Sequence, residues 1–74
     1  MKYPISTGQA ARVLNTTEPR LAEQVRRGKI QPEPEVIAGR RLWHREHLLE
    51  AAEHLGILTD ELRARIELEV ADVA

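Results

Sequence analysis

The chain has 74 residues, enough for one domain, and it contains no cysteine, which excludes disulfide scaffolds, thiolate zinc sites and cysteine nucleophiles. Hydrophobic residues make up 42% and charged residues 31% of the sequence, which is typical of a globular chain, and no apolar run approaches the roughly 18 residues of a membrane span. The first residues lack the apolar core of a signal peptide, so we expect a cytoplasmic protein without a membrane partner.

The net charge of −1 conceals two halves of opposite sign. Residues 1–45 hold nine basic and four acidic side chains, a net charge of +5. Residues 46–74 hold two basic and eight acidic side chains, a net charge of −6. This division predicts a basic surface for an anionic partner and a separate acidic surface. The alternative is two ordinary solvated faces with scattered charges.

The first two predicted helices are joined by a very short turn. Ser6, with Gln9 three residues later, has the pattern of a capping box, and the apolar spacing that follows predicts a helix ending near Leu14. After a turn rich in Asn and Thr, Thr17 is the expected N-cap of a second helix that ends at Gly28. Two short helices joined in this way are the outline of a helix-turn-helix.

A short β-hairpin is predicted next, because two prolines exclude a helix from residues 32–34. Residues 35–37 and 40–43 are rich in β-branched and aromatic types and flank a turn that contains Gly39. A two-stranded ribbon of this length needs support from the helices, so we expect Trp43 to anchor it in the core.

Two further helices follow the hairpin. The third is expected from His44 or Arg45 to Leu55, with Gly56 as its terminator, and the fourth over about residues 60–72. The apolar stripe of the fourth helix either folds back onto the third helix to complete the core or pairs with a second copy or another protein. The residues of this stripe are Leu62, Ile66, Val70 and Val73.

These elements predict a mainly α fold with a small β-hairpin. The order of helix, turn, helix, two-stranded wing and helix is that of a winged helix-turn-helix, which we place at residues 1–56. Residues 57–74 then supply a C-terminal helix for core completion or dimerisation.

Four segments taken together resemble a known family. They are the first helix at residues 5–14, the turn at residues 15–17, the sequence Arg26-Arg27-Gly28-Lys29-Ile30 and the sequence Gly39-Arg40-Arg41-Leu42-Trp43. As an ordered set over about fifty residues, they resemble the DNA-binding domain of the MerR superfamily, especially its small single-domain branch of excisionase-like and AlpA-like regulators.

The resemblance implies sequence-specific binding of double-stranded DNA, with the second helix in the major groove and a wing arginine, by the family pattern Arg41, on phosphate beside the minor groove. From side-chain chemistry, Arg20 and Gln24 are the candidates for base contacts, because Arg and Gln form bidentate hydrogen bonds with guanine and adenine, respectively. The other expected DNA-binding residues are basic side chains and capping hydroxyls suited to phosphate, namely Thr7, Thr17, Arg27, Lys29 and Arg40. Strand alternation points Arg40 and Arg41 to opposite faces, so we expect only one of them to contact DNA. The alternative is that these arginines pair with Glu33 or Glu35.

Some residues depart from the family pattern. Glu18 and Glu23 repel phosphate, although a glutamate can accept a hydrogen bond from a cytosine amino group. Leu42 stands where the wing often has a second arginine, and His44 is a poor helix cap. These departures predict weak DNA affinity or a surface that binds protein instead. The expected roles are therefore a transcription regulator or an excisionase-type recombination directionality factor, acting as a weak homodimer or DNA-assisted oligomer, with an integrase or other protein as a further partner. The alternative is a protein-interaction module acting through the C-terminal helix or the acidic face.

No catalytic signature or glycine-rich phosphate loop is present, so we expect neither an enzyme nor a cofactor. His47, Glu50 and His54 have the i, i+3, i+7 spacing that places them on one side of a helix, where they could hold zinc. The same spacing is that of ordinary exposed helix pairs, and we expect no metal site.

Overall fold

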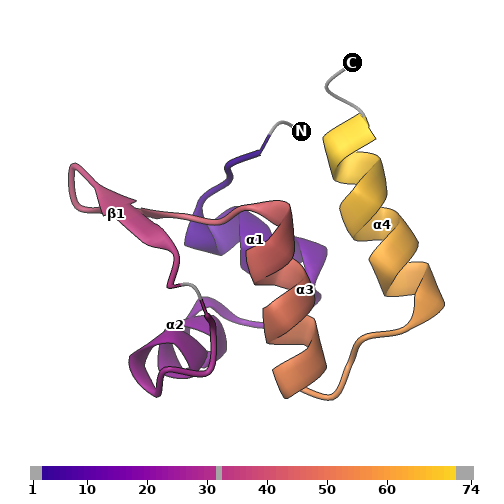
Figure 1. The fold of residues 1–74 in the computed structure, drawn as a ribbon, viewed down its shortest axis with the longest axis horizontal. Coiled ribbons are helices and arrows are strands. Elements are labelled where there is room, and N and C mark those ends of the chain that lie inside the picture. The colour runs from indigo at the N-terminus through magenta and orange to yellow at the C-terminus, as the bar shows by residue number, and fades with distance from the viewer. Residues whose placement is uncertain (1–2, 32, 72–74) are drawn as a thin grey trace.

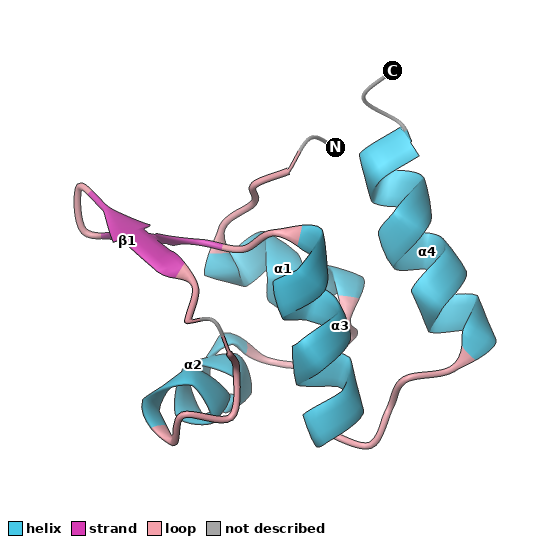
Figure 2. Cartoon of the chain, in the orientation of Figure 1, coloured by secondary structure: helices cyan, strands magenta, loops and turns pink. Residues whose placement is uncertain are grey.

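The computed structural model describes residues 3–31 and 33–71, with the backbone alone for residues 68–71. Its elements follow the predicted order of two helices, a hairpin and two more helices (Figures 1 and 2). The fold is therefore mainly helical with one antiparallel hairpin, as the sequence predicts. The elements are α1 (Thr7–Val13), α2 (Glu18–Arg26), β1 (Glu35–Ile37), β2 (Arg40–Leu42), α3 (Arg45–His54) and α4 (Asp60–Ala71).

Local hydrogen bonds define the first two helices where the sequence places them. The Ser6 hydroxyl accepts a hydrogen bond from the Gln9 amide at 3.1 Å, and the Gln9 side chain accepts one from the Ser6 amide at 3.2 Å, which completes the capping box. Asn15 makes the tight turn with a φ of 56°, and Thr17 caps α2 by accepting a hydrogen bond from the Arg20 amide at 3.4 Å. The predicted helix boundaries are confirmed.

The hairpin is short and stands away from the helices (Figure 1). Val36 is opposite Arg41 and Ile37 is opposite Arg40 in the antiparallel register, and every residue of β1 is exposed. The turn residues Ala38 and Gly39 both have positive φ, at 52° and 78°, as a two-residue turn matched to the strand twist requires.

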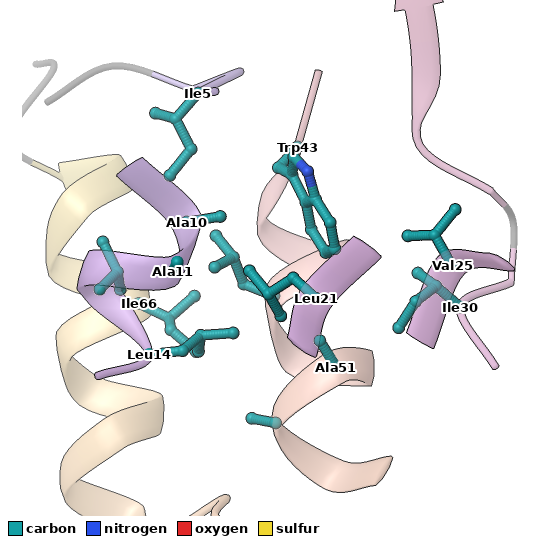
Figure 3. Packing of buried hydrophobic residues seen from close by; sticks show 13 residues of the cluster. Ile5, Ala10, Ala11, Leu14, Leu21, Val25, Ile30, Trp43, Ala51 and Ile66 are labelled. Carbon is teal, nitrogen blue, oxygen red and sulfur yellow. The ribbon is translucent and has the colours of Figure 1, made fainter. Parts of the chain in front are cut away.

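Trp43 joins this hairpin to the rest of the chain. It ends the strand segment expected from the sequence, but it pairs with Ile5 and not with β1, through backbone N–H to O hydrogen bonds of 2.9 and 2.8 Å. Its side chain is fully buried in a single core cluster, shown in Figure 3. The other large, fully buried members are Leu14, Leu21, Ile30, Leu48 and Ile66.

The start of α3 is stabilised by a histidine in place of the usual Ser or Thr cap. The ring Nδ1 of His47 accepts a hydrogen bond from the His44 amide at 2.8 Å, and the ring meets Trp43 edge-on at a centroid distance of 6.3 Å. His47 is buried, so it does not join Glu50 and His54 in an exposed row; those two form their own contact at 3.1 Å. Within the described ranges, no group of three His, Cys, Asp or Glu side chains is placed to hold a metal ion.

Helix α4 folds back and completes the core of the single chain. Ile66 is fully buried, and Leu62 is half-buried against the core cluster. The Tyr3 hydroxyl donates a hydrogen bond to the Ile66 carbonyl at 3.2 Å, and the Arg45 guanidinium lies 2.6 Å from the Glu67 carboxylate. Of the alternatives left open by the sequence, the single chain shows the fold-back at Ile66, whose side chain is covered by the chain itself. Pairing of this helix with a second copy or another protein stays a prediction.

Of the other residues in the predicted α4 stripe, only Leu62 has a described side chain. Leu62 contacts the core, whereas the side chain of Val70 and all of Val73 lie outside the described residues. None of the helices in the described part of the chain has the length and apolar content needed to cross a membrane.

Candidate nucleic-acid interface

Helix α2 presents most of its surface to solvent. Leu21 and Val25 are buried against the core, and they hold the helix by one face only. Pro19, Arg20, Ala22, Arg26 and Arg27 are exposed, whereas Glu23 and Gln24 are half-buried. A helix held in this way keeps an outward face and two flanks available for a partner.

A half-buried carboxylate on α2, that of Glu23, pairs with two exposed arginines of the same helix end. Glu23 lies 2.8 Å from Arg27 Nε, and its other oxygen lies 2.6 Å from Arg26 Nη2. Hydrogen bonds from Arg26 and then Arg27 hold the pKa of Glu23 below its ordinary value, and the same pairing raises the pKa of Arg26. Arg27, expected to contact phosphate, is thus engaged within the helix, although the three groups keep a net charge of +1.

The two predicted base-contacting residues share one flank of α2. Arg20 and Gln24 line a hollow of about 320 Å³, together with Pro19, Glu23 and Leu55 near the end of α3. Arg20 is exposed and forms no ion pair with any other residue that the structure describes. The Gln24 side-chain oxygen is buried and has no hydrogen-bond partner in that same set.

The hairpin arginines lie near the opposite flank of α2. Arg40 and Arg41 line a hollow of about 390 Å³ with Glu18 at the start of α2 and with residues 6–8 at the start of α1. Strand alternation predicts opposite directions for the two arginines, yet both border this hollow, as does Gly39 of the hairpin turn. Arg40 is exposed, whereas Arg41 is half-buried, and its buried Nε has no hydrogen-bond partner among the residues that the structure describes.

The two threonines expected near phosphate are engaged as acceptors inside the chain. Thr7 Oγ1 accepts from the Trp43 indole at 2.9 Å, and Thr17 Oγ1 accepts from the Arg20 amide. Each threonine hydroxyl can therefore contact a phosphate oxygen only by donating its own proton. Lys29, beyond the end of α2, is exposed.

Sequence reasoning missed the position of Glu18. Its carboxylate lies over Gly8, where a Cβ would come within 3.2 Å of one carboxylate oxygen. The sequence does place a glycine in the first turn of α1 and an acid at the first position of α2. These two residues alone do not show that they meet, because the contact depends on the turn that brings the two helix starts together.

Comparison of the chain with protein-family models, curated proteins and solved structures finds no match in any of the three.

Proposed function

We propose that this protein binds double-stranded DNA sequence-specifically, as a winged helix-turn-helix of the MerR kind. Helix α2 would enter the major groove, and the hairpin would act as the wing, with Arg40 and Arg41 on phosphate beside the minor groove. The observation that carries this proposal is the placement of arginines on both flanks of α2, Arg20 on one and the hairpin pair on the other, none of which forms an ion pair within the described part of the chain.

The shape of the molecule supports the same orientation. Helix α2 and the hairpin lie on one side of the molecule, and α4 lies on the opposite side (Figure 1). Helix α4 has an acidic surplus of its own, with Asp60, Glu61, Glu67 and Glu69 against Arg63 and Arg65, and it lies away from the proposed interface. This separation of charge attracts DNA to one side of the molecule and repels it from the other.

Base reading falls to the polar residues on one flank of α2. An arginine can donate two hydrogen bonds to the O6 and N7 of guanine, and a glutamine can pair with the N6 and N7 of adenine. Arg20 and Gln24 lie one turn apart on that flank, so they would reach neighbouring base pairs. Gln24 must rotate its buried oxygen outward to do so.

The burial of Ile66 bears on how copies assemble. Because α4 completes its own core, we propose that the folded unit is a single chain and that several copies gather on DNA at adjacent sites. A regulator and an excisionase-type recombination factor both use such assembly, and both roles belong to this proposal.

The test is a fluorescence anisotropy titration of a random-sequence duplex at two salt concentrations. We expect a dissociation constant of about 10⁻⁴–10⁻⁶ M that weakens steeply with salt, because phosphate contacts release counterions. Arg20→Ala and Arg41→Gln should each weaken binding. Arg63→Ala removes the same charge from exposed α4 and is the matched control. Absence of binding at low salt, or an equal loss in the control, would refute the proposal.

A second candidate function rests on a different hollow. Leu55, Ile57 and Leu62 line part of a depression of about 270 Å³ where the end of α3 and the start of α4 meet the turn between α1 and α2. Its other lining residues are Leu14, Asn15, Thr16 and Arg20. Ile57 is 36% exposed, and the Thr16 hydroxyl beside it is buried without a hydrogen-bond partner among the described residues. A protein partner docked there should bind more weakly to Ile57→Ser, which introduces no charge beside Arg20 and should leave binding to random duplex nearly unchanged.

A further inference from the structure

Glu18 is an acidic side chain in an otherwise basic part of the proposed interface. It is the first residue of α2, and it lines the same hollow as Arg40 and Arg41. Within the described ranges its carboxylate forms no hydrogen bond and no ion pair, so neither guanidinium closes onto it. The hollow therefore presents two unpaired cations and one unpaired anion to whatever enters it.

The start of α2 is poorly suited to a phosphate. Pro19 has no amide proton, and the Arg20 amide already donates to the Thr17 hydroxyl. A carboxylate at the first position adds direct repulsion. The usual attraction of a helix N-terminus for anions is thus weakened at α2, and the cationic side chains that line this hollow are Arg40 and Arg41.

The side of the hollow formed by the Glu18 carboxylate is suited to a group that donates hydrogen bonds. In the major groove, the N-terminal residues of the second helix of a helix-turn-helix are those that contact base edges. The donors on those edges are the amino groups of cytosine and adenine, and adenine places the N7 acceptor next to its amino group. A carboxylate is therefore matched best by the N4 amino group of cytosine.

We propose, resting on the DNA-binding function above, that Glu18 is a specificity-determining residue that accepts a hydrogen bond from a cytosine N4 amino group. The arginines across the hollow hold the neighbouring phosphate and so set the distance between the Glu18 carboxylate and the base edge. DNA that offers no donor at this position leaves a desolvated carboxylate facing an acceptor or a methyl group. Glu18 thus lowers the affinity for most DNA sequences but not for those that place a cytosine amino group at this position.

The experiment is selection from a randomised duplex library with the wild type, Glu18→Gln and Glu18→Ala, after circular dichroism has shown that each variant is folded. The wild type should select cytosine at one position. Glu18→Gln should select adenine there, because a glutamine pairs with N6 and N7, and Glu18→Ala should show no preference. Both variants should bind random duplex a few-fold more tightly. Glu53→Gln makes the same charge change on exposed α3 and should leave the selected sequence unchanged.

A second measurement isolates the hydrogen bond itself. Replacing the selected cytosine by a pyrimidin-2-one nucleotide removes only the amino group. The wild type should lose on the order of tenfold in affinity, and Glu18→Ala should lose nothing. Selection of one and the same sequence by all three proteins would overturn the role of Glu18 and leave the DNA-binding function standing. So would tighter binding by the variants without any change of preferred base. Failure of the wild type to bind DNA would overturn both.

Discussion

The indole nitrogen of Trp43 donates a hydrogen bond of 2.9 Å to the hydroxyl oxygen of Thr7, 36 residues earlier in the chain. Trp43 directly follows β2, and Thr7 is the first residue of α1. The bond therefore fixes the base of the hairpin against the first helix. Together with the backbone pairing of Ile5 and Trp43, it determines where Arg40 and Arg41 lie relative to α2.

Replacing Thr7 by Val should destabilise the protein by about 1–3 kcal/mol, because a fully buried indole N–H would lose its acceptor. Thr7→Ser keeps the oxygen and is the control. Urea denaturation followed by tryptophan fluorescence measures both. Equal stability of Thr7→Val and the wild type would mean that the bond does not hold the hairpin base.

Ile66→Ala should lower the free energy of unfolding by about 2–5 kcal/mol, the range found when large aliphatic core residues are truncated. In a domain of 74 residues this is a large share of the total stability. Urea denaturation gives the change, and Ala64→Ser at an exposed position of α4 should be nearly neutral. A loss of self-association without a loss of stability would instead place Ile66 at an interface between copies.

Ala38→Asn should stabilise the hairpin. Ala38 has a φ of 52°, a left-handed conformation that costs a residue with a Cβ roughly 1–2 kcal/mol, whereas Asn adopts it more readily. Asn-Gly is also the favoured pair for a turn of this kind. We expect a rise in unfolding free energy of about 0.5 kcal/mol, within the span of those effects. Gly39→Ala, with its φ of 78°, should change stability in the opposite direction, and thermal melts compare the two.

The pairing of Glu23 with Arg26 and Arg27 should make stability depend on pH in the acidic range. The pKa of Glu23 is lowered below its ordinary value of 4.5, so its contribution is fully present above that pH. The contribution is lost as the pH falls through the lowered pKa of the folded state. Urea midpoints measured from neutral pH downward should show the advantage of the wild type over Glu23→Gln shrinking on acidification. A constant difference would show that the ion pairs do not persist in solution.

Glu23→Gln should also change DNA binding. Loss of the carboxylate frees Arg26 and Arg27 for phosphate, so binding to random duplex should tighten at low salt and fall more steeply as salt rises. The slope of log K against log salt is the quantity to compare. An unchanged slope would place these two arginines outside the contact surface.

The first helices and the hairpin could be predicted from sequence because their signals are local. Ser6 with Gln9, and Thr17 with the Arg20 amide, act across three residues, and Gly39 makes the hairpin turn. The cap of α3 could not be predicted in the same way. A buried histidine ring three residues into the helix accepts the His44 amide, which no propensity indicates.

The docking of α4 and the arrangement of the site depend on distant contacts. The apolar spacing of α4 predicts an apolar stripe but not what packs against it. In the structure α4 is held by the Tyr3–Ile66 hydrogen bond and by the Arg45–Glu67 ion pair, whose partners are 63 and 22 residues apart in the chain. Likewise, side-chain chemistry identified Arg20, Gln24, Arg40 and Arg41 as candidates. Their division between two flanks of α2, with Glu18 facing the hairpin, required the orientation that Trp43 imposes.

The hydrogen bond between Tyr3 and Ile66 joins the first described segment of the chain to the last helix. Closing a loop of that length costs chain entropy before any contact is gained, so the step is slow compared with forming a helical turn. The core lacks Ile66 until this closure occurs, and α1 to α3 alone leave their apolar surfaces partly uncovered. Folding should therefore be completed only after α4 has been synthesised, when Ile66 enters the core.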